Sequence, residues 1–118
     1  MILSRIRISD TLELPIKCDL YVLDMIQQKY GTVTDFEMKL AGLRQDGKEI
    51  VKCEPSANAV AFALPLMVME GMDIEKEEKG IIYDIATERE LLNAVTRDFR
   101  IIAKELHAEM KRCFQVKK

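Results

Sequence analysis

Several residue types are scarce in this chain, and each scarcity excludes a class of site. The 118 residues include no tryptophan, one histidine and five glycines. The single histidine, His107, is the one candidate for a base beside a nucleophile, and a lone histidine on a helix is more often a packing residue. The glycines form no Gly-x-Gly-x-x-Gly or phosphate-binding loop. We therefore predict no catalytic residue, no nucleotide site and no cofactor.

Cysteine is scarce as well. Cys18, Cys53 and Cys113 are odd in number and widely spaced, so they predict neither a disulfide framework nor a Cys-x-x-Cys metal-ligand pair. We expect reduced, buried thiols of a cytoplasmic protein. The acidic run at 75–78 lacks the alternating ligands and central glycine of a calcium loop, so we predict no metal site.

Neither sign of charge prevails, and no apolar run is long. The 18 basic and 20 acidic residues give no broad positive field, which argues against nucleic-acid binding. The apolar run from Ala59 to Met69 has eleven residues, short of the roughly twenty that cross a bilayer. The N-terminus has no signal-peptide pattern, so we expect a cytoplasmic protein that makes no membrane contact. With 48% hydrophobic and 32% charged residues, we expect one folded domain spanning 1–118.

The first eighteen residues alternate between apolar and polar positions. Isoleucine and leucine occupy most even positions from Ile2 to Ile16, on both sides of the Ser9-Asp10 pair. This period of two predicts a β-hairpin over residues 1–18 with one face on a core. Pro15 cannot donate a backbone hydrogen bond, so we expect its strand to keep a free edge where a partner can dock.

Residues 19–118 are predicted to be mainly helical, which makes the fold α+β with four or five helices. The helical spacing of apolar residues, together with capping and stop residues, predicts a helix between Asp19 and Gly31 with Leu20 on its buried face, and a short helix from Thr34 to Gly42. A hairpin or extended loop follows around a type I′ turn at Asp46-Gly47, and then a helix from Ser56 to Met69 or Glu70 that Gly71 stops. The rest is predicted as a solvated connector at 70–80, a short strand at 81–85, and helices capped by Thr87 and Thr96.

The helix after Ser56 is apolar on all sides and contains Pro65, which should kink or break it. An apolar helix must be covered by its own domain or by another chain. Flexible methionine side chains can repack against dissimilar apolar partners, although methionines also fill cores. We predict a partner-binding surface at these five residues: Phe62, Leu66, Met67, Met69 and Met72.

The order of these features resembles a known family. The hairpin "MILSRIRISDTLELPIK", the helix "CDLYVLDMIQQKYG", the apolar helix "SANAVAFALPLMVMEGM" and the closing helix "TRDFRIIAKELHAEMKRCF" resemble the small tail assembly chaperones of long-tailed phages and prophages. The resemblance implies a non-enzymatic protein of the bacterial cytoplasm that binds the tape measure protein, helps to recruit tail tube subunits and associates with itself. It also implies a programmed frameshift, for which the codons of Lys117-Lys118 are a hypothetical site.

A second interpretation is a small cytoplasmic regulatory or adaptor protein, such as an antitoxin-like dimer. DNA-binding members of that class need a basic recognition helix. The last helix instead mixes basic and acidic residues: Arg100, Lys104, Lys111 and Arg112 with Asp98, Glu105 and Glu109. This weakens the second interpretation without removing it.

Overall fold

A computed structural model describes residues 2–114. Along the chain the elements are β1 (Ser4–Arg7), β2 (Glu13–Ile16), α1 (Leu20–Tyr30), α2 (Val33–Ala41), β3 (Leu43–Asp46), β4 (Glu49–Lys52), α3 (Ala57–Lys79), α4 (Glu88–Ala94) and α5 (Phe99–Cys113). Five helices and two β-hairpins form one α+β globule in this range, which confirms the predicted fold class. The lysines of the hypothetical frameshift site lie outside the described residues.

The first hairpin is confirmed. β1 and β2 pair antiparallel, with Ile6 opposite Leu14 and Arg5 opposite Pro15. The Ile8 N–H donates to the Leu12 carbonyl at 2.8 Å and closes the turn. Ile6 and Leu14 are fully buried, while the arginines of β1 face outward. The period of two in the sequence is therefore the division between the core face and the solvent face of this hairpin.

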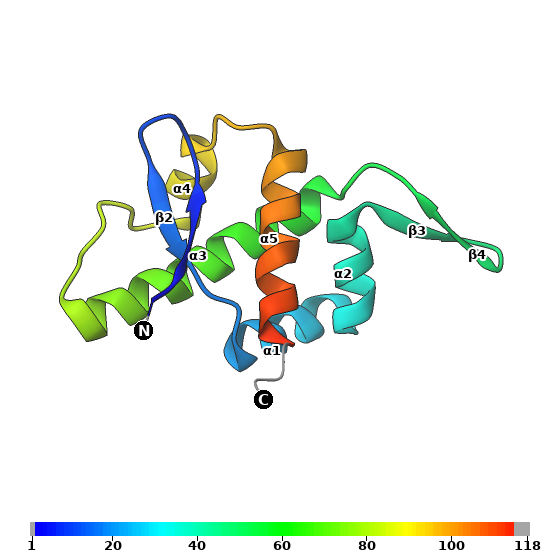
Figure 1. Cartoon of the computed structure of the whole chain (residues 1–118), viewed down its shortest axis with the longest axis horizontal. Coiled ribbons are helices and arrows are strands. Elements are labelled where there is room, and N and C mark those ends of the chain that lie inside the picture. Colours follow the sequence, from blue (N-terminus) through cyan, green and yellow to red (C-terminus); the bar gives the residue numbers. More distant parts are fainter. Residues whose placement is uncertain (1, 115–118) are drawn as a thin grey trace.

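Helix α3 is the central element and is longer than predicted. Figure 1 shows α3 crossing the length of the globule, with the first hairpin over one half and α5 across the other. Ser56 caps its start as predicted, accepting from the Ala59 N–H at 3.1 Å, but the helix continues to Lys79 and ends at Gly80. The predicted stop at Gly71 and the predicted connector at 70–80 are wrong. The helix also does not break at Pro65.

Gly71 was predicted to end the helix, but it lies inside α3 at the point where β2 crosses it. β2 crosses α3 so closely that a Cβ atom at position 71 would lie 2.8 Å from the carbonyl carbon and oxygen of Pro15. Next to this crossing, the Lys17 N–H donates to the Met67 carbonyl of α3 at 3.0 Å. Glycine at this position is therefore required for the approach of two backbones, and the helix passes through it.

The shorter helices start at capping residues, two of which were misplaced. Asp19 caps α1 and Thr87 caps α4, as predicted. The cap of α2 is Thr32 where Thr34 was predicted, and the cap of α5 is Asp98 where Thr96 was predicted. The Thr96 N–H instead donates to the Ile8 carbonyl at 3.1 Å, which ties this segment to the first hairpin.

The second hairpin is also confirmed, but its turn differs. The β3–β4 register pairs Asp46 with Glu49, so Gly47 and Lys48 form the turn. Among the described residues only glycines have positive φ, which excludes the type I′ turn predicted at Asp46-Gly47. Most of this hairpin is exposed, and it projects from the globule as an arm (Figure 1). The strand predicted at 81–85 is absent, because these residues pair with neither hairpin.

One core contains side chains from the first hairpin and all five helices. Its largest fully buried side chains include Ile6, Phe36, Leu64, Leu91 and Ile102. The predicted burial of all three thiols is only partly correct: Cys18 is buried, Cys113 is half-buried and Cys53 is exposed. Burial and the nearby Cys113 thiol raise the pKa of Cys18.

Among the described residues, α3 is long and apolar enough to cross a membrane by length and composition. The expectation of no span relied on an apolar run of eleven residues, and the helix that contains this run has 23. Half of its most apolar window is buried in the protein. Packing against the hairpin and α5 accounts for the apolar composition of that buried half.

Candidate partner-binding groove

The two sides of α3 have different surroundings. The buried face, with Leu64, Met67, Val68 and Met72, lies in the core. The outer face carries Phe62, Leu66 and Met69, which are half-buried at the edge of the core. Spacings of four and three residues place these outer side chains on successive turns of one side of the helix. The outer face is therefore an apolar stripe that the chain covers only in part.

Two of the five predicted binding residues are thus in the core. Met67 is fully buried, and Met72 is 9% exposed. The prediction treated them as the exposed end of a helix that stops at Gly71. Because α3 continues to Lys79, both methionines fall inside it and belong to the core. The part of the prediction that placed Met67 and Met72 on a surface is corrected, whereas Phe62, Leu66 and Met69 lie at the surface.

The three surface residues form one wall of a groove. Tyr21 and Met25 of α1 also line it; they are four residues apart and therefore on one side of that helix, and Ala86 and Glu88 line it at the start of α4. We call this depression, of about 420 Å³, the α1–α3 groove. Neither α1 residue was predicted, because the predicted apolar face of that helix was a different one. The signal available was an apolar pair at i and i+4 on the opposite side.

Aromatic contacts fix one end of the α1–α3 groove. Tyr30 packs edge-on against Phe62, with ring centres 5.7 Å apart, and donates its hydroxyl hydrogen to the side-chain amide oxygen Oδ1 of Asn58 at 2.7 Å. The Lys29 ammonium lies 4.8 Å from the centre of the Phe62 ring. These contacts hold Phe62 in one position, so this end of the groove is preformed and carries a positive charge.

The other end of the groove is acidic. Glu70, Asp73 and Glu88 line it. A hydrogen bond with Asp19 is the largest cause that raises the pKa of Glu70 to about 7, followed by partial burial and by repulsion from Asp19, Asp73 and Glu77. Asp19, Asp73 and Glu77 therefore add negative charge around Glu70 at this end of the groove.

A second apolar depression adjoins the first. It has a volume of about 730 Å³, and Leu20, Tyr21, Val33 and Phe114 are among its lining residues. Tyr21 belongs to both depressions. Leu20 is 81% exposed, which corrects its predicted place on the buried face of α1, and Phe114 is 50% exposed. The apolar surface therefore continues from the α1–α3 groove around the start of α1.

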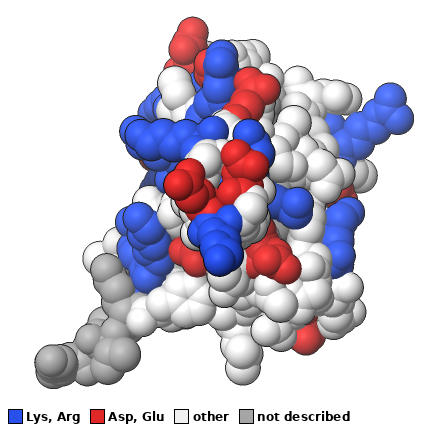
Figure 2. Space-filling model, turned by 90° about the vertical axis from the view of Figure 1, so that its right-hand side faces the viewer, with Lys and Arg blue, Asp and Glu red and all other residues white. Residues whose placement is uncertain are grey.

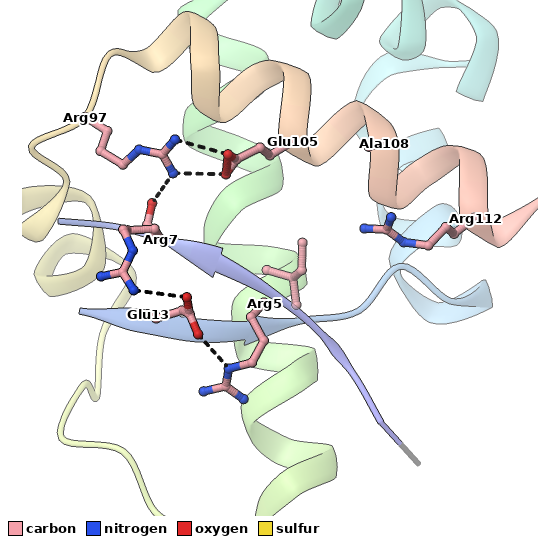
Figure 3. A pocket seen from close by; sticks show the side chains of 8 residues that line it. Arg5, Arg7, Glu13, Arg97, Glu105, Ala108 and Arg112 are labelled. Carbon is pink, nitrogen blue, oxygen red and sulfur yellow. Dashed lines mark hydrogen bonds and ion pairs between the residues drawn. The ribbon is translucent and has the colours of Figure 1, made fainter. Parts of the chain in front are cut away.

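A third depression lies between the first hairpin and α5 and is lined by four arginines (Figure 3). Each arginine already has a carboxylate partner: Arg5 with Glu13 and Glu75, Arg7 with Glu13, Arg97 with Glu105, and Arg112 with Glu109. Two of these partners, Glu75 and Glu109, are buried, and Glu109 also accepts from the Cys18 N–H at 3.1 Å. Four glutamates balance four arginines, so this cluster joins the hairpin to α3 and α5 and leaves no excess charge for an anion.

The single histidine lies apart from the arginine cluster and from the α1–α3 groove. His107, half-buried on α5, contacts the Glu37 carboxylate at 3.0 Å. Within residues 2–114, no three His, Cys, Asp or Glu side chains are grouped to hold a metal ion. Figure 2 shows positive and negative side chains intermixed on the face turned toward the viewer. Among the features described, the α1–α3 groove is therefore the best candidate for a binding site.

Comparison with protein-family models, with curated proteins and with solved structures found no match for this chain.

Proposed function

We propose that this protein is a non-enzymatic tail assembly chaperone of a phage or prophage, which binds the tape measure protein in the α1–α3 groove. The observation that carries the proposal is the incompletely covered outer face of α3, where Phe62, Leu66 and Met69 face Tyr21 and Met25 of α1. A chaperone of this kind must hold apolar segments of a long partner apart until the tail is built.

The side chains of the groove suit such a task. Met25, Leu66 and Met69 are flexible and adapt to apolar segments of different shape. Phe62 and Tyr21 supply large apolar contact areas, and held aromatic side chains often dominate the energy of an interface. The exposed Leu20 and Phe114 extend this area and offer a second contact, for copies of the same chain or for tail tube subunits.

Co-expression with the tape measure protein that the proposal predicts to be encoded beside this chain tests the proposal. We expect the chain to increase the soluble fraction of that protein at least several-fold, and we expect Leu66→Asp with Met69→Asp to abolish the increase, because a charge in an apolar contact is costly. The control is Ile50→Asp on the exposed arm, which should leave the increase intact.

Both variants must first be shown to fold by thermal unfolding. A wild-type chain that leaves the tape measure protein insoluble refutes the proposal, and so does a gene neighbourhood without tail genes.

A further inference from the structure

The shape of the α1–α3 groove fits a helical segment of a partner protein. Phe62, Leu66, Met69 and Asp73 follow one another along one side of α3 over about 16 Å, at 1.5 Å per residue. Tyr21 and Met25 form a shorter parallel series on α1. An apolar groove lined by residues of two helices accepts an amphipathic helix, whose apolar residues recur at i, i+3, i+4 and i+7.

The charge of the groove selects among such helices. Three of the ten lining residues, Glu70, Asp73 and Glu88, are acidic, and none is lysine or arginine. Asp19 adds a fourth carboxylate next to Glu70. In contrast with the arginine cluster of Figure 3, no guanidinium lines this groove to balance the carboxylates. A partner that brings positive charge to this end relieves the repulsion among them.

From these observations we propose that the occupant of the α1–α3 groove is an amphipathic helix whose apolar side is flanked by lysine or arginine at the Glu70–Asp73 end. This inference rests on the proposed function, because it specifies the class of tape measure segment that the same groove binds. The basic residues contact Glu70, Asp73 and Glu88, and the apolar residues pack on Phe62, Leu66 and Met69.

Two synthetic helices of sixteen residues with the same leucine stripe test the charge preference. One carries lysine at all its polar positions, and the other carries glutamate. We expect the lysine helix to bind at least about 10-fold more tightly in fluorescence anisotropy at pH 8 and low salt, with the preference shrinking at high salt. Equal affinity for the two helices overturns the inference.

Variants without the charges of Glu70 and Asp73 test whether these residues cause the preference for the lysine helix. Glu70→Gln with Asp73→Asn keeps the size of both side chains and removes two charges, and we expect about 5- to 10-fold weaker binding of the lysine helix with little change in melting temperature. The matched control is Asp46→Asn with Glu49→Gln, which removes two charges from the exposed arm and should leave binding unchanged. Equal losses in the two double variants mean a general charge attraction and overturn the inference.

A third peptide, with the sequence of residues 99–113, tests whether a second copy occupies the groove. This segment carries Arg100, Lys104 and Lys111 beside the exposed Ile101. Tighter binding of this peptide than of the lysine helix makes another copy the occupant and overturns the inference.

The two proposals fail separately. A tape measure protein that is solubilised equally well by the Glu70→Gln, Asp73→Asn chain contradicts the charge preference and leaves the chaperone function intact. Selective binding of the lysine helix by a chain that never solubilises a tape measure protein contradicts the chaperone function instead.

Discussion

The buried and outer faces of α3 carry similar side chains but have different surroundings. Leu64 and Met67 lie one turn apart on the buried face and are at most 1% exposed, whereas Leu66 and Met69 lie on the outer face and stay partly open to solvent. The difference comes from how closely the neighbouring elements pack: β2 and α5 contact α3 most extensively, and α1, α2 and α4 contact it less. The apolar composition of α3 therefore suits a core helix. The neighbouring elements determine which of its side chains stay exposed and can contact a partner.

The largest expected effect contrasts two methionines that are two residues apart. Met67→Glu places a carboxylate in the core without a partner and should cost about 4 kcal/mol or more, enough to unfold a typical domain. Met69→Glu, at the groove, should cost about 1 kcal/mol or less. Urea unfolding followed by circular dichroism measures both. Similar losses for the two variants contradict the assignment of Met67 and Met69 to different faces.

The next effect concerns the crossing of β2 over α3. Gly71→Ala adds a methyl group that would meet the Pro15 backbone at 2.8 Å. We expect a loss of about 1–3 kcal/mol in the free energy of unfolding, although alanine is the better helix former by about 1 kcal/mol. Lys76→Ala at an exposed position of α3 is the control and should change stability by only a few tenths of a kcal/mol. A Gly71→Ala protein that gains stability shows that the two backbones are further apart.

Two acidic residues of α3 give a smaller contrast. Glu75 is 5% exposed, and it accepts hydrogen bonds from Arg5 at 3.1 Å and from the Tyr83 hydroxyl. We expect Glu75→Gln to cost about 2 kcal/mol, because it removes the charge from a buried, hydrogen-bonded pair. Asp73→Asn, at the exposed rim of the groove, should cost less than about 0.5 kcal/mol. Thermal unfolding compares them, and equal melting temperatures refute the anchoring role of Glu75.

The smallest effect is a pH dependence at the groove. The pKa of Glu70 is about 7 in the folded protein and 4.5 as the ordinary value, so the folded state binds more protons between these values. The stability due to this proton is present below about pH 4.5 and is lost as pH rises through about 7. Solvent near Glu70 keeps the effect small.

Glu70→Gln removes this proton-binding site. We expect the wild type to lose more stability than Glu70→Gln between pH 5 and pH 8, measured as free energies of unfolding in urea. Parallel pH profiles of the two proteins contradict a shared proton between Glu70 and Asp19.

Local patterns in the sequence predicted most of the elements but not their limits. Alternation identified the first hairpin, and Asp19, Ser56 and Thr87 were placed correctly as caps, because these signals act within a few residues. Gly71 misled the prediction, because a helix end and a close backbone crossing both favour a residue without Cβ. Only the distant strand β2 distinguishes the two.

The same error shaped the predicted site. A helix that stops at Gly71 exposes Met67 and Met72 at its end, and a helix that continues to Lys79 buries them. Phe62, Leu66 and Met69 were identified correctly, because their spacing of four and three residues places them on one outer face of the helix wherever the helix ends. Tyr21 and Met25 were missed, because pairing of α1 with α3 is a tertiary contact that neither segment encodes alone.

The arm formed by β3 and β4 is a place where the chain can be divided into two parts. Its turn at Gly47-Lys48 divides the protein into a piece with the first hairpin, α1 and α2 and a piece with α3, α4 and α5. Core side chains come from both pieces, and most of the arm lies outside the core. A backbone opened at this turn therefore leaves two polypeptides whose shared interface is the whole core, so the protein is suited to fragment complementation.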